Sequence, residues 1–173
     1  AANFESTVKT SPIVFVDWHG ASRYAEWRRE KTGKPYRLLN ELEWEKAARG
    51  VDGRLLPWGD HVDPSFACML GSREGDPARV PVTRYPTDCS PYGVRGMAGN
   101  VRDWCINDWK PDGAAAPDGR IRIDPADPAS TEQRSARGGA WTSVPAFCRL
   151  AARFAAPPSS SFGGAGFRLA RSI

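Results

Sequence analysis

The chain has 173 residues, of which 40% are hydrophobic and 25% charged, and its mean hydropathy is -0.50. A chain of this length can bury about 70% of its unfolded surface, so it can hold a core without disulfides or metals. No stretch approaches the roughly 18 apolar residues of a membrane span. The formal net charge is +4, but the basic residues are scattered, which favours a mixed-charge surface over nucleic-acid binding.

The N-terminal part of the chain predicts a strand and then a helix. The run 13–18 (IVFVDW) is rich in β-branched and aromatic residues, which is typical of a buried strand. A helix is predicted over 20–32, ending at Gly33 with Pro35 beyond it.

A second helix is predicted over 40–49 by its end signals. Asn40 suits the N-cap, Glu43 stands three residues later as a capping-box partner, and Gly50 follows the last helical residue.

Glycine and proline punctuate the rest of the chain, so loops dominate it. Short strands are predicted between the loops at 80–85, 101–106, 137–141 and 166–170. Two helices followed by short, mostly antiparallel strands and long loops predict an α+β fold.

Cysteine and histidine spacing gives no sign of a metal or redox site. The cysteines lack Cys-x-x-Cys spacing, and buried thiols are expected rather than two disulfides; they are Cys68, Cys89, Cys105 and Cys148. The histidines, His19 and His61, have no ligand-type neighbours at metal spacing. We therefore expect no cofactor and no metal.

Five motifs follow one another in order: 37–49 (RLLNELEWEKAAR), 57–59 (PWG), 92–104 (YGVRGMAGNVRDW), 137–141 (RGGAW) and 166–168 (GFR). Together they resemble the motifs of the formylglycine-generating-enzyme (sulfatase-modifying) family, which has a variant of the C-type lectin fold. The resemblance implies a single C-type lectin-like domain over 1–173, with an upstream part of the parent protein missing.

The resemblance does not imply one activity, because this family includes oxidases and binding proteins. The oxidase relatives use a cysteine pair that holds copper, and Ser143 and Cys148 stand at its two places. One thiol is therefore missing. Some relatives hold calcium near the stretch 96–103, where Asp103 remains but Gly96 replaces the Asn side chain; we expect no calcium here.

The C-terminal segment also resembles a second group, the variable proteins of diversity-generating retroelements. Three positions within 138–168, Ala140, Leu150 and Ala165, depart from the scaffold of their variable regions. The positions that match this scaffold are Gly138, Gly139, Trp141, Cys148, Arg149, Ala151, Arg153, Pro158, Gly166, Phe167 and Arg168. We interpret Cys148 and both arginines as scaffold, with the arginines bound to loop carbonyls or acids.

The resemblance carries a prediction about codons. Changing the adenines of an AAC codon gives NNC codons, which encode no Lys, Glu, Gln, Met or Trp, and none of these occurs in 142–165. A loop rich in Ala, Ser, Pro and Gly would also meet this condition, so an ordinary small-residue loop is the alternative.

Aromatic side chains among small ones, with no acidic residue, favour a protein-recognition surface in this segment. The ligand is unknown, and we expect a protein rather than a nucleic acid or an inserted membrane segment. The expected ligand-facing residues are Thr142, Ser143, Val144, Ala146, Phe147, Leu150, Ala152, Phe154, Ala155, Ser159, Ser160, Phe162 and Gly163. Side chains of the tryptophans, including Trp27, are expected to supply the core.

The leading hypothesis is thus a non-enzymatic variable protein. The alternatives are a formylglycine-generating-like oxidase and an accessory or regulatory domain with a fixed binding face. No signal peptide is visible, which leaves cytoplasmic and surface- or virion-displayed locations open. The 4 Asn and 1 Gln fit a heat-adapted or GC-rich source, and a prophage is the expected setting for a retroelement protein.

Overall fold

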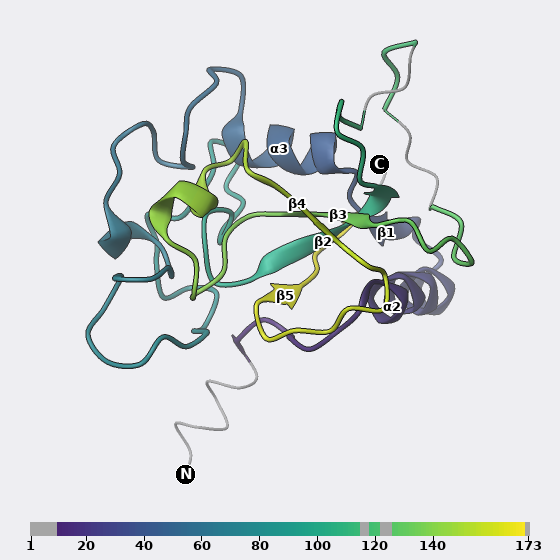
Figure 1. The fold of residues 1–173 in the computed structure, drawn as a ribbon, viewed down its shortest axis with the longest axis horizontal. Helices are drawn as coiled ribbons and strands as arrows, with labels where there is room; N and C mark the ends of the chain where they lie inside the picture. Colours follow the sequence, from purple (N-terminus) through teal and green to yellow (C-terminus); the bar gives the residue numbers. More distant parts are fainter. Residues whose placement is uncertain (1–9, 115–117, 122–125, 172–173) are drawn as a thin grey trace.

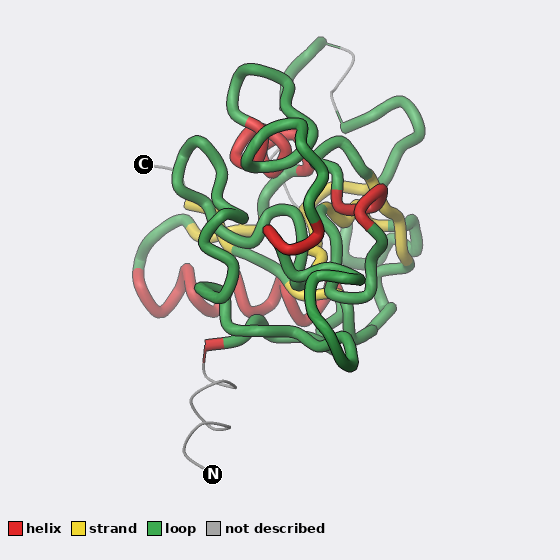
Figure 2. Tube along the Cα trace, turned by 90° about the vertical axis from the view of Figure 1, so that its left-hand side faces the viewer, coloured by secondary structure: helices red, strands yellow, loops and turns green. Residues whose placement is uncertain are grey.

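The computed structural model describes residues 10–114, 118–121 and 126–171 (Figure 1). Its elements, in chain order, are α2 (Trp18–Thr32), β1 (Tyr36–Leu38), α3 (Glu41–Arg49), η1 (Pro64–Phe66), β2 (Arg102–Asp108), β3 (Arg134–Arg137), η2 (Pro145–Cys148), β4 (Arg153–Ala156), β5 (Ala165–Gly166) and β6 (Leu169–Arg171). Loops make up much of the trace, as Figure 2 shows. The predicted α+β class is confirmed.

The strands form two small sheets. The larger has the order β4-β3-β2-β5, in which β3 runs antiparallel to both β2 and β4 while β5 runs parallel to β2. The second pairs β1 with β6 in antiparallel register. The last strand therefore returns to the chain segment that follows α2.

The two helices cover opposite faces of the larger sheet (Figure 1). Alternate residues of a strand point to opposite faces. Trp104 of β2 packs with Trp18 of α2, whereas the adjacent Cys105 packs with Trp44 of α3. The core thus lies in two layers, one on each side of β2.

Helix α2 begins two residues before the predicted start. The Asp17 side chain accepts a hydrogen bond from the Gly20 N–H at 2.7 Å, and Gly33 ends the helix in the left-handed region at φ 65°. Ala21 and Ala25 face inward. Trp27 on this helix is 48% exposed, so its assignment to the core is wrong.

Two of the predicted strands are wrong. Residues 13–17 form a loop that leads into α2, which begins at Trp18, and Ile13 and Phe15 are 58% and 70% exposed. No neighbouring strand pairs with it among the described residues. The run 80–85 is also loop, because the Asn100 side chain bonds both the N–H and the carbonyl of Val80 and Pro81 supplies no donor.

The other strand predictions are correct in part. The run 101–106 corresponds to β2, and 166–170 overlaps β5 and β6. The strand predicted at 137–141 ends at Arg137, because Gly138 adopts a φ of 85° that takes the backbone out of the sheet.

The capping box predicted for α3 is confirmed. The Asn40 side chain accepts a hydrogen bond from the Leu42 N–H at 2.9 Å, and the Glu43 carboxylate accepts one from the Asn40 N–H at 2.9 Å. Two N–H groups at the helix start are thereby satisfied.

Asn40→Ala should lower the free energy of unfolding by about 1–2 kcal/mol, because the N–H groups of Leu42 and Glu43 lose the Asn40 side-chain oxygen as their acceptor. Urea denaturation measures the change. Thr32→Ala is the control: this exposed hydroxyl donates to the Arg28 carbonyl and accepts from the Lys34 N–H, and its loss should cost less than about 0.5 kcal/mol. Equal effects would contradict the assignment of the cap.

Three tryptophans dominate the interior, as predicted. Trp18, Trp44 and Trp104 are at most 1% exposed. Each indole N–H donates to a fixed acceptor, which is the Cys105 carbonyl for Trp18, the Asp103 carboxylate for Trp44 and the Val16 carbonyl for Trp104. These three side chains therefore bury a large aromatic area while each indole N–H keeps a hydrogen-bond acceptor.

The four cysteines are free thiols. Three are buried, which confirms the expectation for them, while Cys89 is half-buried.

Candidate binding surface

The segment after the Gly138–Gly139 pair presents apolar side chains to solvent. Val144, the N-cap of η2, is 41% exposed, and Phe147 within η2 is 55% exposed. Phe154 of β4 lies edge-to-face with Phe147, with ring centroids 6.0 Å apart. We call Val144, Phe147 and Phe154 the apolar ridge. Exposed clusters of this kind are typical of recognition surfaces.

The predicted ligand-facing residues divide into three groups by exposure. Exposed are Thr142, Val144, Ala146, Phe147 and Ser159; half-buried are Ala152, Phe154, Ala155, Ser160, Phe162 and Gly163; buried are Ser143 and Leu150.

The two buried residues cannot face a ligand, so their assignment is corrected. The Leu150 side chain is 0% exposed and packs with Leu39, Trp44 and Met97 beneath α3. The Ser143 hydroxyl accepts a hydrogen bond from the Ala140 N–H at 3.0 Å, which holds it inside its own turn. The half-buried Phe162 is also directed inward, since its ring lies 6.1 Å from that of Trp104.

The buried carboxylate of Glu41 binds Arg153 of β4 and so fixes the segment 142–165 to α3. Glu41, the first residue of α3, accepts hydrogen bonds from Arg153 Nε and Nη2 at 2.6 and 2.9 Å. Arg137 of β3 donates to the same carboxylate at 3.3 Å. Burial raises the pKa of Glu41, but hydrogen bonds from Arg153, Ser135 and Asn107, with the Arg153 charge, outweigh it and hold the pKa below its usual value.

Both arginines of the segment act as predicted. Arg153 binds Glu41 and also donates to the Lys110 and Pro111 carbonyls, whereas Arg149 is exposed and donates to the Ala146 carbonyl at 3.0 Å. Arg153 therefore ties β4 to α3.

Arg102, at the start of β2, is a site residue that the sequence reasoning missed. Its guanidinium carbon lies 3.5 Å from the centre of the Phe154 ring. Nε donates to the Gly138 carbonyl at 3.0 Å and Nη2 to the Ser143 hydroxyl at 3.3 Å. Burial lowers the pKa of this guanidinium. The cation is thus fixed under the apolar ridge.

The surface continues on the other side of Arg102 toward the N-terminal loop. The Arg102 N–H donates to the Gly164 carbonyl at 2.8 Å. Next to it, a Cβ built on Gly163 would lie 3.1 Å from the Phe15 ring and 3.5 Å from the Trp141 ring. Phe15 has a φ of 57°, which is unusual for a side chain of its size. A strained, exposed aromatic residue therefore borders the predicted segment.

The thiol of Cys148 does not fit the two-thiolate copper site that the family resemblance implies. Its side chain is fully buried, and burial raises its pKa to about 12. The second place of the pair holds the Ser143 hydroxyl, which accepts hydrogen bonds from Ala140 and Arg102. A hydroxyl engaged in this way cannot serve as the second thiolate.

The place where some relatives hold calcium is filled by protein contacts. Asp103 Oδ2 accepts hydrogen bonds from Trp44 Nε1 at 2.8 Å and from Arg168 Nε at 2.5 Å. An arginine at this carboxylate repels a cation, so the residues do not fit a calcium site. Within the ranges that the structure describes, no group of three or more His, Cys, Asp or Glu side chains could hold a metal ion.

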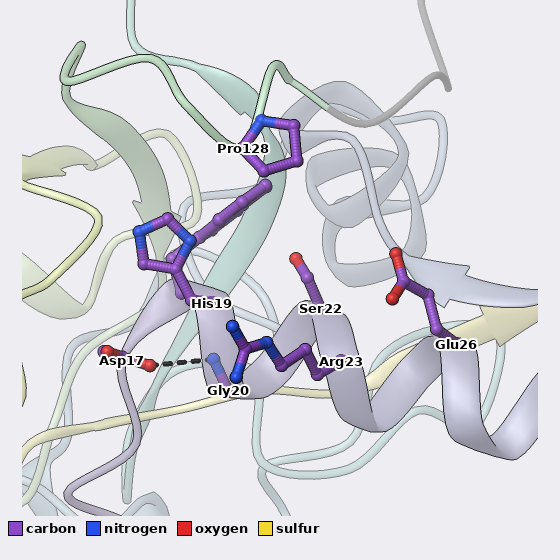
Figure 3. A pocket seen from close by; sticks show the side chains of 8 residues that line it. Asp17, His19, Gly20, Ser22, Arg23, Glu26 and Pro128 are labelled. Atoms are coloured by element: carbon purple, nitrogen blue, oxygen red, sulfur yellow. Dashed lines mark hydrogen bonds between the residues drawn. The ribbon is translucent and has the colours of Figure 1, made fainter.

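A pocket of about 560 Å³ lies apart from this surface, along the outer side of α2 (Figure 3). Pro128 forms the opposite wall, and the Asp17–Gly20 capping bond lies at one end. Its lining residues are Asp17, Trp18, His19, Gly20, Ser22, Arg23, Glu26 and Pro128. No residue of 142–165 contributes to it.

In the described part of the chain, no helix is both long and apolar enough to cross a membrane.

Comparison with known proteins identifies relatives over nearly the whole chain. The formylglycine-generating enzyme of Thermomonospora curvata is 34% identical over 174 residues, which cover 92% of this chain and 55% of that enzyme. The mouse inactive C-alpha-formylglycine-generating enzyme 2 is 30% identical over 175 residues, covering 93% and 49%. The chain spans about half the length of these curated relatives.

Two solved structures share the fold. PvdO from Pseudomonas aeruginosa superposes with a TM-score of 0.80 at 32% identity, covering 95% of this chain and 63% of PvdO. Treponema denticola variable protein 1 superposes with a TM-score of 0.72 at 22% identity, covering 92% and 70%. These similarities confirm the expected C-type lectin-like fold.

The sequence profile of the sulfatase-modifying factor enzyme 1-like domain matches residues 2–173. The chain therefore belongs to the sulfatase-modifying factor enzyme 1-like family.

Proposed function

We propose that this chain is a non-catalytic ligand-binding domain whose residues 138–168 form the variable region of a diversity-generating retroelement protein. Its ligand is a protein, and the apolar ridge contacts that ligand. The fold similarity to the Treponema variable protein supports this proposal, because it shows that this chain has the fold of such a protein.

One observation carries the proposal. Within one short stretch, Val144 and Phe147 point into solvent while Cys148 and Leu150 are fully buried. The buried side chains contribute to folding stability, whereas the exposed ones can change at a cost usually within about 0.5 kcal/mol. A ligand contact at a hot-spot aromatic residue of an interface contributes about 2 kcal/mol or more. Recognition can therefore vary without loss of the fold.

The genomic sequence beside the gene tests the retroelement origin. A second copy of codons 138–168 should lie near a reverse-transcriptase gene and differ from the first mainly at adenines. If no such repeat exists, the proposal is wrong, and the domain is instead an accessory module with a fixed binding face.

A stability experiment tests the division between surface and scaffold. Variants in which Val144, Ala146 and Phe147 are replaced by residues that NNC codons encode should mostly have unfolding midpoints within about 2 °C of the wild-type midpoint. Leu150→Ala should lower the free energy of unfolding by about 2–5 kcal/mol, because it leaves a cavity beneath α3. Thermal unfolding followed by circular dichroism measures both. Equal losses at the exposed positions would contradict a variable surface.

Formylglycine generation is the rival function, favoured by the names of the curated relatives. It is tested by incubating the protein with Cu(I) and a cysteine-containing peptide and following the peptide by mass spectrometry. We expect no turnover, since Cys148 is buried and its partner position holds Ser143. Copper-dependent turnover that Cys148→Ser abolishes would displace our proposal.

A further inference from the structure

Four arginines in or next to the larger sheet have carboxylate partners, whereas the half-buried Arg102 of β2 has none among the described residues. The four pairs are Arg134–Asp108, Arg137–Glu41, Arg153–Glu41 and Arg168–Asp103. Arg102 has no carboxylate within 4.0 Å among the described residues. Buried charges in proteins are usually paired, because desolvation without a counter-charge is costly.

The neutral contacts of Arg102 fix its orientation without neutralising it. Nε and Nη2 donate to the Gly138 carbonyl and the Ser143 hydroxyl, and the ring of Phe154 covers one face. Nη1 donates no hydrogen bond to the described residues. The guanidinium is therefore held in place with donor capacity remaining.

The position of this cation relates it to the apolar ridge. Phe154 contacts both the Arg102 guanidinium and the Phe147 ring, so the charge lies one side chain away from the exposed aromatic. The segment 142–165 contains no acidic residue that could move to neutralise it. A ligand that covers the ridge brings its own groups next to Arg102.

We propose that Arg102 binds a carboxylate side chain of the protein ligand, so that this surface selects a peptide segment in which Asp or Glu lies beside an apolar residue. This inference rests on the proposed binding function. The guanidinium is pre-positioned, which reduces the ordering cost of the ion pair, and covering it with ligand removes water from around the pair. The apolar neighbour of the ligand carboxylate packs on Phe147.

The probe is a phage-displayed library of random linear peptides, selected on the wild-type protein. Selected peptides should be enriched in Asp or Glu next to aromatic or aliphatic residues. Synthetic versions with Glu→Gln or Asp→Asn should bind the wild type about 10- to 100-fold more weakly, measured by fluorescence anisotropy. The Arg102→Met variant should bind the acidic peptide more weakly by the same factor, and its affinities for the acidic peptide and for the amide version should be equal.

Arg149→Met is the matched control, because Arg149 is an exposed arginine of the same segment; it should change affinity by less than about 3-fold. Arg102→Met should shift the thermal unfolding midpoint by less than about 3 °C, since loss of two hydrogen bonds is offset by removal of a half-buried charge that has no carboxylate partner. If this variant does not fold, the peptide substitutions still test the inference on unaltered protein.

The outcomes separate the two proposals. Peptides that depend on Phe147 but bind equally well with Gln or Asn in place of the acid overturn the role of Arg102 and leave the binding surface intact. Selected peptides whose affinity is unchanged by Phe147→Ala overturn the ridge as the binding site, and with it the proposed function.

Discussion

Glu41→Gln should lower the free energy of unfolding by about 3–5 kcal/mol, the largest effect expected of any substitution that preserves side-chain shape. The Glu41 side chain is 1% exposed and contacts Arg137 and Arg153, of which Arg137 is also fully buried. An amide leaves Arg153 facing a neutral partner that carries two N–H donors of its own, while Arg137 keeps only its second carboxylate, Glu45. Urea denaturation followed by tryptophan fluorescence measures the loss.

Glu26→Gln on the exposed side of α2 is the control, and it should change stability by less than about 0.5 kcal/mol. The pH dependence provides a second test. Because the folded protein holds the pKa of Glu41 below its unfolded value, its stabilising contribution is fully present above the unfolded pKa and is lost as pH falls through the folded pKa. Wild-type stability should therefore fall below about pH 4.5 more steeply than that of Glu41→Gln. Parallel pH curves would contradict the role of this carboxylate.

Gly139→Ala should destabilise the fold by about 3 kcal/mol or more. An added Cβ would overlap both the Cys148 sulfur and the Ala98 carbonyl oxygen, and neither can move without shifting packed backbone. The requirement here is for space rather than for a positive φ, since the φ of Gly139 is not positive. Calorimetric unfolding measures the loss.

Gly163→Ala is the matched substitution and should cost less than about 1 kcal/mol. Its Cβ meets the rim of the Phe15 ring at 3.1 Å, and this exposed side chain can move aside. If Gly163→Ala and Gly139→Ala are equally damaging, the distinction between a tolerant surface and a rigid scaffold does not hold.

Sequence reasoning located the elements that carry local signals. The capping box at Asn40 and the αL glycine after α2 depend on residues a few positions apart, and both were predicted correctly. The strand predicted at 13–18 failed because its β-branched residues have no neighbouring strand among the described residues, which is a tertiary fact. Strand β4 was missed for the same reason, since its partner β3 is separated from it by the loop 138–152 and no pattern within β4 reports that pairing.

The candidate surface was predictable to a similar degree. The motif framework indicated the segment in which Val144 and Phe147 are exposed, because residues between fixed scaffold positions tend to face outward. Burial of Leu150 depends on α3, more than a hundred residues earlier in the sequence, and no pattern within 142–165 reports that contact. Arg102 lies outside the segment altogether, and its contacts with Gly138 and Phe154 are visible only in three dimensions.

The clamp between Glu41 and Arg153 has a consequence for how the surface meets a partner. Because β4 is bonded to α3 from within, the backbone under Phe154 is already in its final position before any encounter. For the proposed binding function, we expect association to leave the main chain nearly unchanged, with displacements below about 1 Å, so that side-chain rotations alone adjust the fit. We also expect differences in affinity among variants of the proposed surface to arise mainly from how slowly each complex dissociates.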